Sequence, residues 1–159
     1  MKISNFNTTT ACNVPRKLSL RDPFTNDLLV DDEGNTLDFY VYGAHSDVSR
    51  NARRDSERRT KSGKLSDEES AKIGAEYLAK VTQGWSANIE DDDGPIEFNQ
   101  KNAMKVYLSE DWIAGQVLNF SQGLGNYDPK LYEKSGSGSE NAPGSIASRK
   151  AQKQVDIEL

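Results

Sequence analysis

Residues 84–120 decide the fold class, and they read GWSANIEDDDGPIEFNQKNAMKVYLSEDWIAGQVLNF. Apolar and polar residues alternate over residues 85–89 and again over residues 96–98, on either side of an acidic turn. Alternation on both sides of a turn rich in Asp and Gly predicts a β-hairpin. The stretch also holds both tryptophans of the chain, Trp85 and Trp112. We expect both to anchor the core, because large aromatic side chains bury much apolar surface.

Three helices are predicted from capping residues and helical spacing. Asn99 can cap a short helix, and Ser109 or Glu110 begins another directly after it. Upstream, Ser66 opens a capping box, and the helix that follows should end at Gly84, where a left-handed stop is expected. Apolar residues recur at helical spacing in these segments, at Ile73, Tyr77, Leu78 and Val81, at Ala103, Met104, Tyr107 and Leu108, and at Trp112, Ile113, Val117 and Phe120.

The N-terminal part of the chain is typical of short strands. Apolar runs at residues 18–20, 28–30 and 37–42 are separated by turn-forming residues at 22–23 and 31–35. Together they predict a small antiparallel meander. The expected fold class is therefore α+β, with an N-terminal antiparallel β-meander, a central helix, a short β-hairpin, C-terminal helices and flexible tails.

A chain of 159 residues has room for one domain and its tails. We expect the α+β domain over residues 17–127. Residues 1–16 are rich in Asn and Thr and predict a flexible arm, and residues 128–159 contain a Ser–Gly repeat that predicts a flexible linker and tail. The tail carries a narrow apolar stripe at every fourth position, formed by Ala147, Ala151, Val155 and Leu159. This stripe either folds on a partner or belongs to a frayed polar tail.

Residues 47–64 form a basic polar segment, which we expect to be a helix or a loop. Seven basic residues stand there against three acidic ones, and apolar residues are almost absent. A helix in this segment would have no apolar stripe to attach it to a core. The segment could bind phosphate groups, but it lacks the interleaved aromatic residues that stack on bases. A solvated helix or mobile loop is the simpler interpretation.

The sequence gives no positive evidence for a catalytic centre, a cofactor or a metal site. Cys12 is the only cysteine, so neither an intramolecular disulfide nor a cysteine-based zinc site can form. His45 is the only histidine, and no nucleophile motif accompanies it. The acidic turns at Gly34 and Gly94 do not match a calcium loop, because an apolar residue would stand at the first ligand position.

The composition also predicts where the protein acts. The chain has no run of about 18 apolar residues, as a membrane helix would need. Its first sixteen residues lack the apolar core of a signal peptide. The formal net charge of −5 gives no global attraction to nucleic acid. We therefore expect a soluble, intracellular protein.

Several short motifs lie between residues 18 and 127. They are the Asp22-Pro23 turn, the Gly34 turn with the strand behind it, Gly84-Trp85, Asp93-Gly94 leading to Phe98, Asn102-Ala103, Asp111-Trp112-Ile113, Gln116-Val117 and Phe120. In these motifs the chain resembles the tail assembly chaperones of long-tailed bacteriophages. Members often close the region with a basic residue before Asn and an aromatic residue, whereas this chain has Gly125-Asn126-Tyr127.

The resemblance implies a non-catalytic protein of viral morphogenesis that acts in the host cytoplasm. Such chaperones bind the tape measure protein before the tail tube polymerises, and the family commonly makes a longer product by ribosomal frameshifting. The implied partners are the tape measure protein, the tail-tube protein and further copies of the chain, with neither a membrane nor nucleic acid expected. We expect the contacts among large apolar residues that one small core cannot fully cover: Tyr107, Trp112 and Phe120, with Val155 and Leu159 in the tail.

Two other classes of protein remain open. A phage structural or head–tail joining protein would share the mixed α/β build and the absence of reactive motifs. A small nucleic-acid-binding regulator would use residues 50–64, and its affinity would fall steeply with salt.

Overall fold

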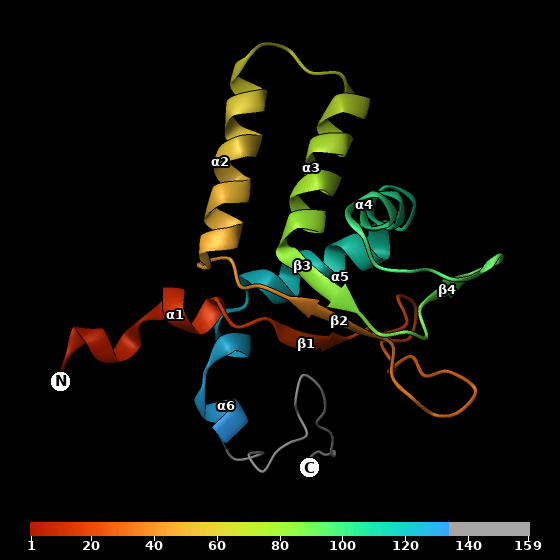
Figure 1. Cartoon of the computed structure of the whole chain (residues 1–159), viewed down its shortest axis with the longest axis horizontal. Helices are drawn as coiled ribbons and strands as arrows, with labels where there is room; N and C mark the ends of the chain where they lie inside the picture. The colour runs from red at the N-terminus through yellow and green to blue at the C-terminus, as the bar shows by residue number, and fades with distance from the viewer. Residues whose placement is uncertain (134–159) are drawn as a thin grey trace.

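The computed structural model describes residues 1–133 and has an α+β fold (Figure 1). Its elements in chain order are η1 (Ile3–Phe6), α1 (Thr8–Cys12), β1 (Arg16–Ser19), β2 (Asp38–Val41), α2 (Asp47–Lys61), α3 (Asp67–Val81), β3 (Thr82–Trp85), β4 (Glu90–Asp91), β5 (Gly94–Pro95), α4 (Gln100–Ser109), α5 (Asp111–Gln122), η2 (Leu124–Tyr127) and α6 (Lys130–Glu133). The expected α+β class is confirmed.

A three-stranded antiparallel sheet in the order β1-β2-β3 forms the centre of the fold. Phe39 and Val41 of the middle strand are fully buried, as suits aromatic and β-branched residues in a covered strand. The N-terminal meander is present, although residues 28–30 join it only through isolated bridges. The third full strand comes from β3, which returns to the sheet after α2 and α3.

The core lies between this sheet and helices α3, α4 and α5. Helix α3 packs on α4, and α5 lies against β2. The fully or almost fully buried apolar residues of this cluster include Leu20, Phe39, Val41, Leu78, Ala79, Val81, Ala103, Val106, Ile113 and Val117. The predicted helices after Ser66 and Asn99 begin as expected, since both side chains accept the capping hydrogen bond and Glu69 completes the box with Ser66.

The expected stop at Gly84 is wrong. Helix α3 ends at Val81, and Thr82 already has extended backbone angles. The Thr82 hydroxyl donates to the Leu78 carbonyl, which satisfies an acceptor at the end of the helix. Gly84 lies inside β3, where it pairs with Tyr40, and it does not have a positive φ.

The hairpin around the acidic turn is present as β4 and β5, but each strand has only two residues. Trp85 belongs to the main sheet instead, where it pairs with Phe39. Its ring packs on Phe39 at 5.2 Å and edge-on against Phe98 at 4.9 Å between ring centroids. Its Nε1 donates to the Ile96 carbonyl at 2.8 Å. Trp85 therefore joins the sheet to the segment after the hairpin.

The expectation of a flexible arm over residues 1–16 needs correction. Helix α1 lies against the fold, and Cys12 is fully buried, with its carbonyl accepting from the Gly43 amide at 3.1 Å. The Asn13 side chain exchanges two hydrogen bonds with Asp47 at the start of α2. These contacts are made by small and polar side chains that carry no apolar periodicity. Only η1, at the beginning of the arm, has no buried residue.

The folded part also extends beyond residue 127, where the linker was expected to begin. Helix α6 follows η2, and the Tyr132 hydroxyl donates to the Asn126 carbonyl at 2.7 Å. The Arg16 guanidinium lies over the Tyr132 ring, 3.7 Å from its centroid, which is the geometry of a cation–π contact. The rest of the expected linker and tail, with the stripe Ala147, Ala151, Val155 and Leu159, lies outside the described residues.

Candidate partner-binding groove

A surface groove of about 660 Å³ lies between the turn at residues 22–26 and helix α5. Its lining consists of Leu18, Ser19, Arg21, Asp22, Pro23, Phe24, Thr25, Asn26, Trp112, Gly115, Gln116, Asn119, Phe120 and Asn126. One wall is therefore a tight turn, and the other is one face of a helix. We call this feature the α5 groove.

The turn is held rigidly by hydrogen bonds to one carboxylate. Oδ1 of Asp22 accepts from the amides of Phe24 at 2.7 Å and Thr25 at 3.1 Å. The Asn26 amide donates to the Asp22 carbonyl at 2.8 Å, and Asn26 has a left-handed φ of 66°, which asparagine tolerates better than most residues. The backbone of Phe24 is thus fixed, while its side chain is 94% exposed.

A side chain of α5 fastens this turn to the helix. Oε1 of Gln116 accepts from the Arg21 amide at 2.9 Å, and Nε2 of Gln116 donates to the Arg21 carbonyl at 2.8 Å. The side-chain amide of Gln116 therefore satisfies both the N–H and the C=O of Arg21, as the backbone of a neighbouring strand would. Because both bonds join residues far apart in sequence, the two walls of the groove keep a fixed separation.

The helical wall presents two half-buried aromatic rings. Trp112 and Phe120 are eight residues apart, which places them on one face of α5 and about 12 Å apart along its axis. Phe120 packs edge-on against Tyr127, with centroids 5.6 Å apart, and Trp112 Nε1 donates to Glu110 Oε1 at 3.1 Å. Gly115 also lines the groove, and a Cβ added there would meet nothing within 4 Å. The α5 groove is thus open at this position of the helical wall.

The structure separates the residues that the sequence suggested as contacts. Trp112 and Phe120 both line the α5 groove. Tyr107 does not belong with them: it is only 4% exposed, and its hydroxyl shares a hydrogen bond with Thr82 inside the core. Burial raises the pKa of Tyr107 far above its ordinary value. Val155 and Leu159 lie outside the described residues.

Phe24 is the groove residue that sequence reasoning missed. It stands directly after the Asp22-Pro23 turn, where a solvated polar loop is the usual expectation. The available signal was a large aromatic residue inside a turn that offers it no strand or helix neighbours. A nearly fully exposed phenylalanine on a rigid turn is unusual, and large exposed apolar groups often mark interaction sites.

A second hollow and the reactive side chains within residues 1–133 are engaged in local contacts. A second, polar hollow of about 560 Å³ contains Asp31, whose pKa is lowered chiefly by the hydrogen bond from Asn88. Within residues 1–133, no group of His, Cys, Asp and Glu side chains could hold a metal ion. His45 Nδ1 hydrogen-bonds to the Thr8 hydroxyl at 2.8 Å, and burial raises the pKa of the Cys12 thiol. None of the helices in the same range is long and apolar enough to cross a membrane.

Comparison of the chain with protein-family models, with curated proteins and with solved structures found no match. The fold and the groove define a small α+β protein with a surface groove in which three aromatic residues stand among polar ones.

Proposed function

We propose that this protein is a non-catalytic tail assembly chaperone of a long-tailed bacteriophage. In this proposal it binds apolar helical segments of the tape measure protein in the host cytoplasm, before the tail tube polymerises. The single observation that carries the binding role is the α5 groove, in which Phe24, Trp112 and Phe120 present apolar surface on a rigid frame. The motif resemblance between residues 18 and 127 gives the class of partner.

The geometry of the α5 groove suits a helix better than a small ligand. Its aromatic wall is about 12 Å long, which corresponds to about two turns of a helix. Leu18 adds apolar surface to the lining, while Arg21, Asp22 and Asn119 add polar groups. Apolar anchor residues with polar groups beside them suit the apolar face of an amphipathic helix and its polar borders.

The groove also suits weak binding between each copy of the protein and one segment of the partner. It is an open surface feature rather than an enclosed cavity, so it excludes water from a bound helix only in part. A partner with many similar apolar segments would still be held well, because several modest contacts act together. Such contacts also release the partner readily when another protein takes their place.

The direct test is co-expression of the chain with the tape measure protein of the same phage, followed by affinity purification. We expect the tape measure protein to become soluble and to co-purify. Phe24→Ala should reduce the amount captured at least about fivefold while leaving the melting temperature within about 1 °C, because a side chain that is 94% exposed contributes little to folding. Phe6→Ala is the matched control, since Phe6 is 66% exposed on η1 and does not line the groove.

A second variant tests the groove by filling it. Gly115→Leu adds a side chain to the lining of the groove at a position where a Cβ meets nothing within 4 Å, and it replaces a poor helix former with a good one. We expect unchanged or slightly higher stability together with a loss of capture similar to that of Phe24→Ala. Full capture by both variants would exclude the α5 groove as the binding site.

Co-expression that neither solubilises nor co-purifies the tape measure protein would contradict the proposed function itself. Recovery of the chain from purified particles would then favour a structural or head–tail joining protein. Salt-dependent binding of nucleic acid through residues 50–64 would favour a regulator.

A further inference from the structure

The described part of the chain separates its charges strongly. Residues 50–64 contain seven basic and two acidic residues. The other described residues contain nine basic and twenty acidic ones. The basic charges therefore gather on α2 and the loop behind it, on a molecule that is otherwise acidic. Figure 1 shows α2 and α3 side by side, projecting from the sheet as an antiparallel pair.

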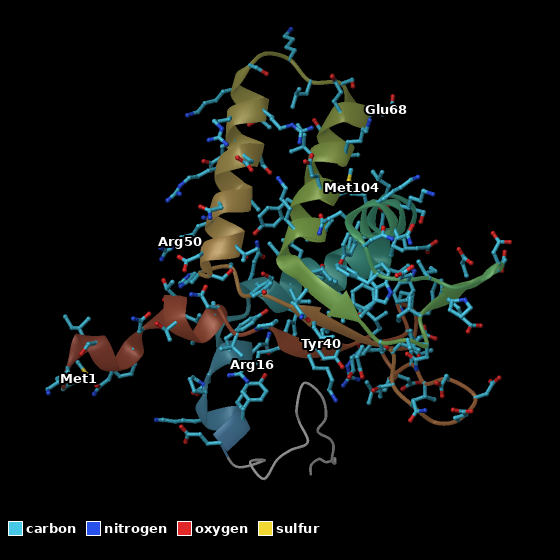
Figure 2. The ribbon with its side chains drawn as sticks, in the orientation of Figure 1. Met1, Arg16, Tyr40, Arg50, Glu68 and Met104 are labelled. Carbon is cyan, nitrogen blue, oxygen red and sulfur yellow. The ribbon has the colours of Figure 1, made fainter. Side chains whose placement is uncertain are left out.

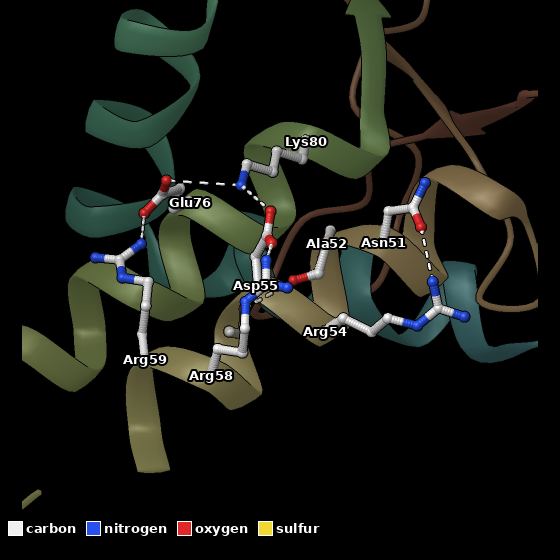
Figure 3. A network of polar contacts seen from close by, with 9 residues as sticks. Asn51, Ala52, Arg54, Asp55, Arg58, Arg59, Glu76 and Lys80 are labelled. Atoms are coloured by element: carbon white, nitrogen blue, oxygen red, sulfur yellow. Dashed lines mark hydrogen bonds and ion pairs between the residues drawn. The ribbon is translucent and has the colours of Figure 1, made fainter. Parts of the chain in front are cut away.

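The face of α2 that meets α3 is held largely by ion pairs (Figure 3). Asp55 and Glu76 both contact Lys80 Nζ, at 3.3 and 3.7 Å, and Arg59 pairs with Glu76. Only Ser49 and Ala52 of α2 are buried. These ion pairs account for the charged residues on the inner side of α2, and they leave the outer side unexplained.

The outer face of α2 carries a row of four basic residues. Arg50, Arg54, Arg58 and Lys61 are spaced by four, four and three residues, so they share one face over about 16 Å. All four are exposed. Arg50, labelled in Figure 2, lies on the side of α2 away from α3. We call this row the basic face of α2.

Most of the basic face has no acidic partner within residues 1–133. Arg58 pairs with Asp55 on its own helix, whereas no ion pair is found there for Arg50, Arg54 or Lys61. Arg50 donates to the Thr9 hydroxyl and Arg54 to the Asn51 side chain, and both of these acceptors are neutral. The positive charge of the face is therefore left largely uncompensated by residues 1–133.

The chain carries a complementary acidic feature at the tip of the β4–β5 hairpin. Residues 90–93 are four consecutive exposed carboxylates, and none of them forms an ion pair with another described residue. The turn is shaped by the Asp93 amide donating to Asp91 Oδ1 at 2.9 Å and by Gly94 with a φ of 119°. In Figure 1 this hairpin projects from the molecule on the side opposite α2.

Two other acidic groups are already engaged in hydrogen bonds within the fold. Asp31 already accepts from Asn88 and from two amides of its own loop. Glu69 closes the capping box with Ser66. The β4–β5 tip differs from these groups in carrying four consecutive exposed carboxylates.

We propose that the basic face of α2 binds the acidic β4–β5 tip of a second copy of this chain. Because the two surfaces lie on different sides of the molecule, the contact is head-to-tail, and each copy can bind one neighbour through each surface. Nucleic acid fits this face less well, because α2 has no aromatic residue for stacking and the rest of the fold is acidic. This inference does not rest on the proposed function, since it uses neither the α5 groove nor its partner.

The experiment is a charge swap followed by sedimentation velocity of the full chain at about 50 mM and about 500 mM salt. The first variant is Arg54→Glu with Lys61→Glu, and the second is Glu90→Lys with Asp92→Lys. None of these four side chains holds an ion pair within the described residues. Lys101→Glu with Lys105→Glu is the control for the first variant, because it makes the same change in net charge on exposed positions of α4.

We expect the parent and the control to associate at low salt and to dissociate at high salt. Each variant alone should associate at least about tenfold more weakly than the parent. An equimolar mixture of the two variants should associate again, because the reversed face of one then meets the reversed tip of the other. A parent that stays monomeric at low salt, or a mixture that fails to associate while the parent does, overturns the proposal.

A different outcome would assign the face to nucleic acid. In that outcome the parent binds duplex DNA, the variant Arg54→Glu with Lys61→Glu alone loses that binding, and the mixture of variants does not restore association. Capture of the tape measure protein through the α5 groove is measured separately with Phe24→Ala. Failure of one proposal is therefore distinguishable from failure of the other.

Discussion

Gly43→Ala should displace the N-terminal helix from the fold. Gly43 lies between β2 and α2, and its amide donates to the Cys12 carbonyl at 3.1 Å. A Cβ at position 43 would stand 2.4 Å from Cys12 Sγ, 2.7 Å from Cys12 Cβ and 3.2 Å from Tyr127 Cδ2. The position has no positive φ, so the effect of the substitution comes from space and not from backbone conformation.

The size of the effect follows from these distances. Ordinary contact between such atoms begins near 3.4 Å, so the new methyl group would overlap Cys12 by about 0.7 to 1 Å. A different rotamer of Cys12 moves its sulfur but leaves its Cβ in place, and Tyr127 is fully buried on the other side. Inserting one methyl group into a packed site typically costs about 1–3 kcal/mol, which is a large part of the stability of a small domain.

Two measurements check this prediction. Urea unfolding should show a lower midpoint for Gly43→Ala, and the Cys12 thiol should react with a thiol reagent much faster than in the parent, where it is fully buried. Gly74→Ala on α3 is the control, since a Cβ there meets nothing within 4 Å and alanine favours a helix. An unchanged midpoint together with a protected thiol in Gly43→Ala would refute the docking of α1.

Two further substitutions test the packing of the sheet and the α2–α3 pair. Trp85→Ala should lower the free energy of unfolding by about 3 kcal/mol, because it removes ring contacts and the hydrogen bond to Ile96, and a urea midpoint equal to that of the parent would disprove the anchor role. Arg59 holds the pKa of Glu76 below its ordinary value, so their pairing stabilises the fold above the unfolded pKa and is lost as the pH falls through the folded pKa. Arg59→Ala should therefore cost less than about 1 kcal/mol at neutral pH and progressively less as the pH falls below the ordinary range of a carboxyl group, and a cost independent of pH in urea titrations would contradict the pairing.

The parts of the fold that sequence predicts well are those determined by neighbouring residues. The Ser66–Glu69 capping box and the Asn99 cap depend on contacts three residues apart, and both form as expected. Trp85 depends on Phe39, which lies 46 positions away, and local alternation assigned it to the wrong strand pair. Tertiary pairing decides such cases, because the same alternation suits either partner.

The docking of α1 was missed for a related reason. Its buried contact is one cysteine against one glycine, Cys12 on Gly43, with polar bonds from Asn13 to Asp47. Periodicity detects stripes of large apolar residues, and a single small residue gives no stripe. The missing side chain of Gly43 is what makes the close approach possible.

The candidate site was predictable only in part. Helical spacing correctly placed Trp112 and Phe120 on one face, and the structure adds that this face borders a groove. The same spacing cannot tell which apolar residue a core will cover, and Tyr107 is buried because Thr82 supplies a partner for its hydroxyl. Phe24 was missed although an aromatic residue inside a turn was a signal, because its exposure results from Asp22 holding the turn in a fixed shape.

The two proposed contacts differ in their physical basis, and this difference has a consequence for assembly. Binding in the α5 groove would depend on apolar surface, which salt strengthens or leaves unchanged, whereas binding through the basic face of α2 would weaken as salt screens the charges. A row of copies joined by charge would present one groove per copy at short, regular distances. Each groove could then be individually weak, since the high effective concentration within the row would raise the affinity for a long partner. Disrupting the charge contact between copies would lower the effective concentration of grooves, so the partner would dissociate from one groove after another while every copy stays folded.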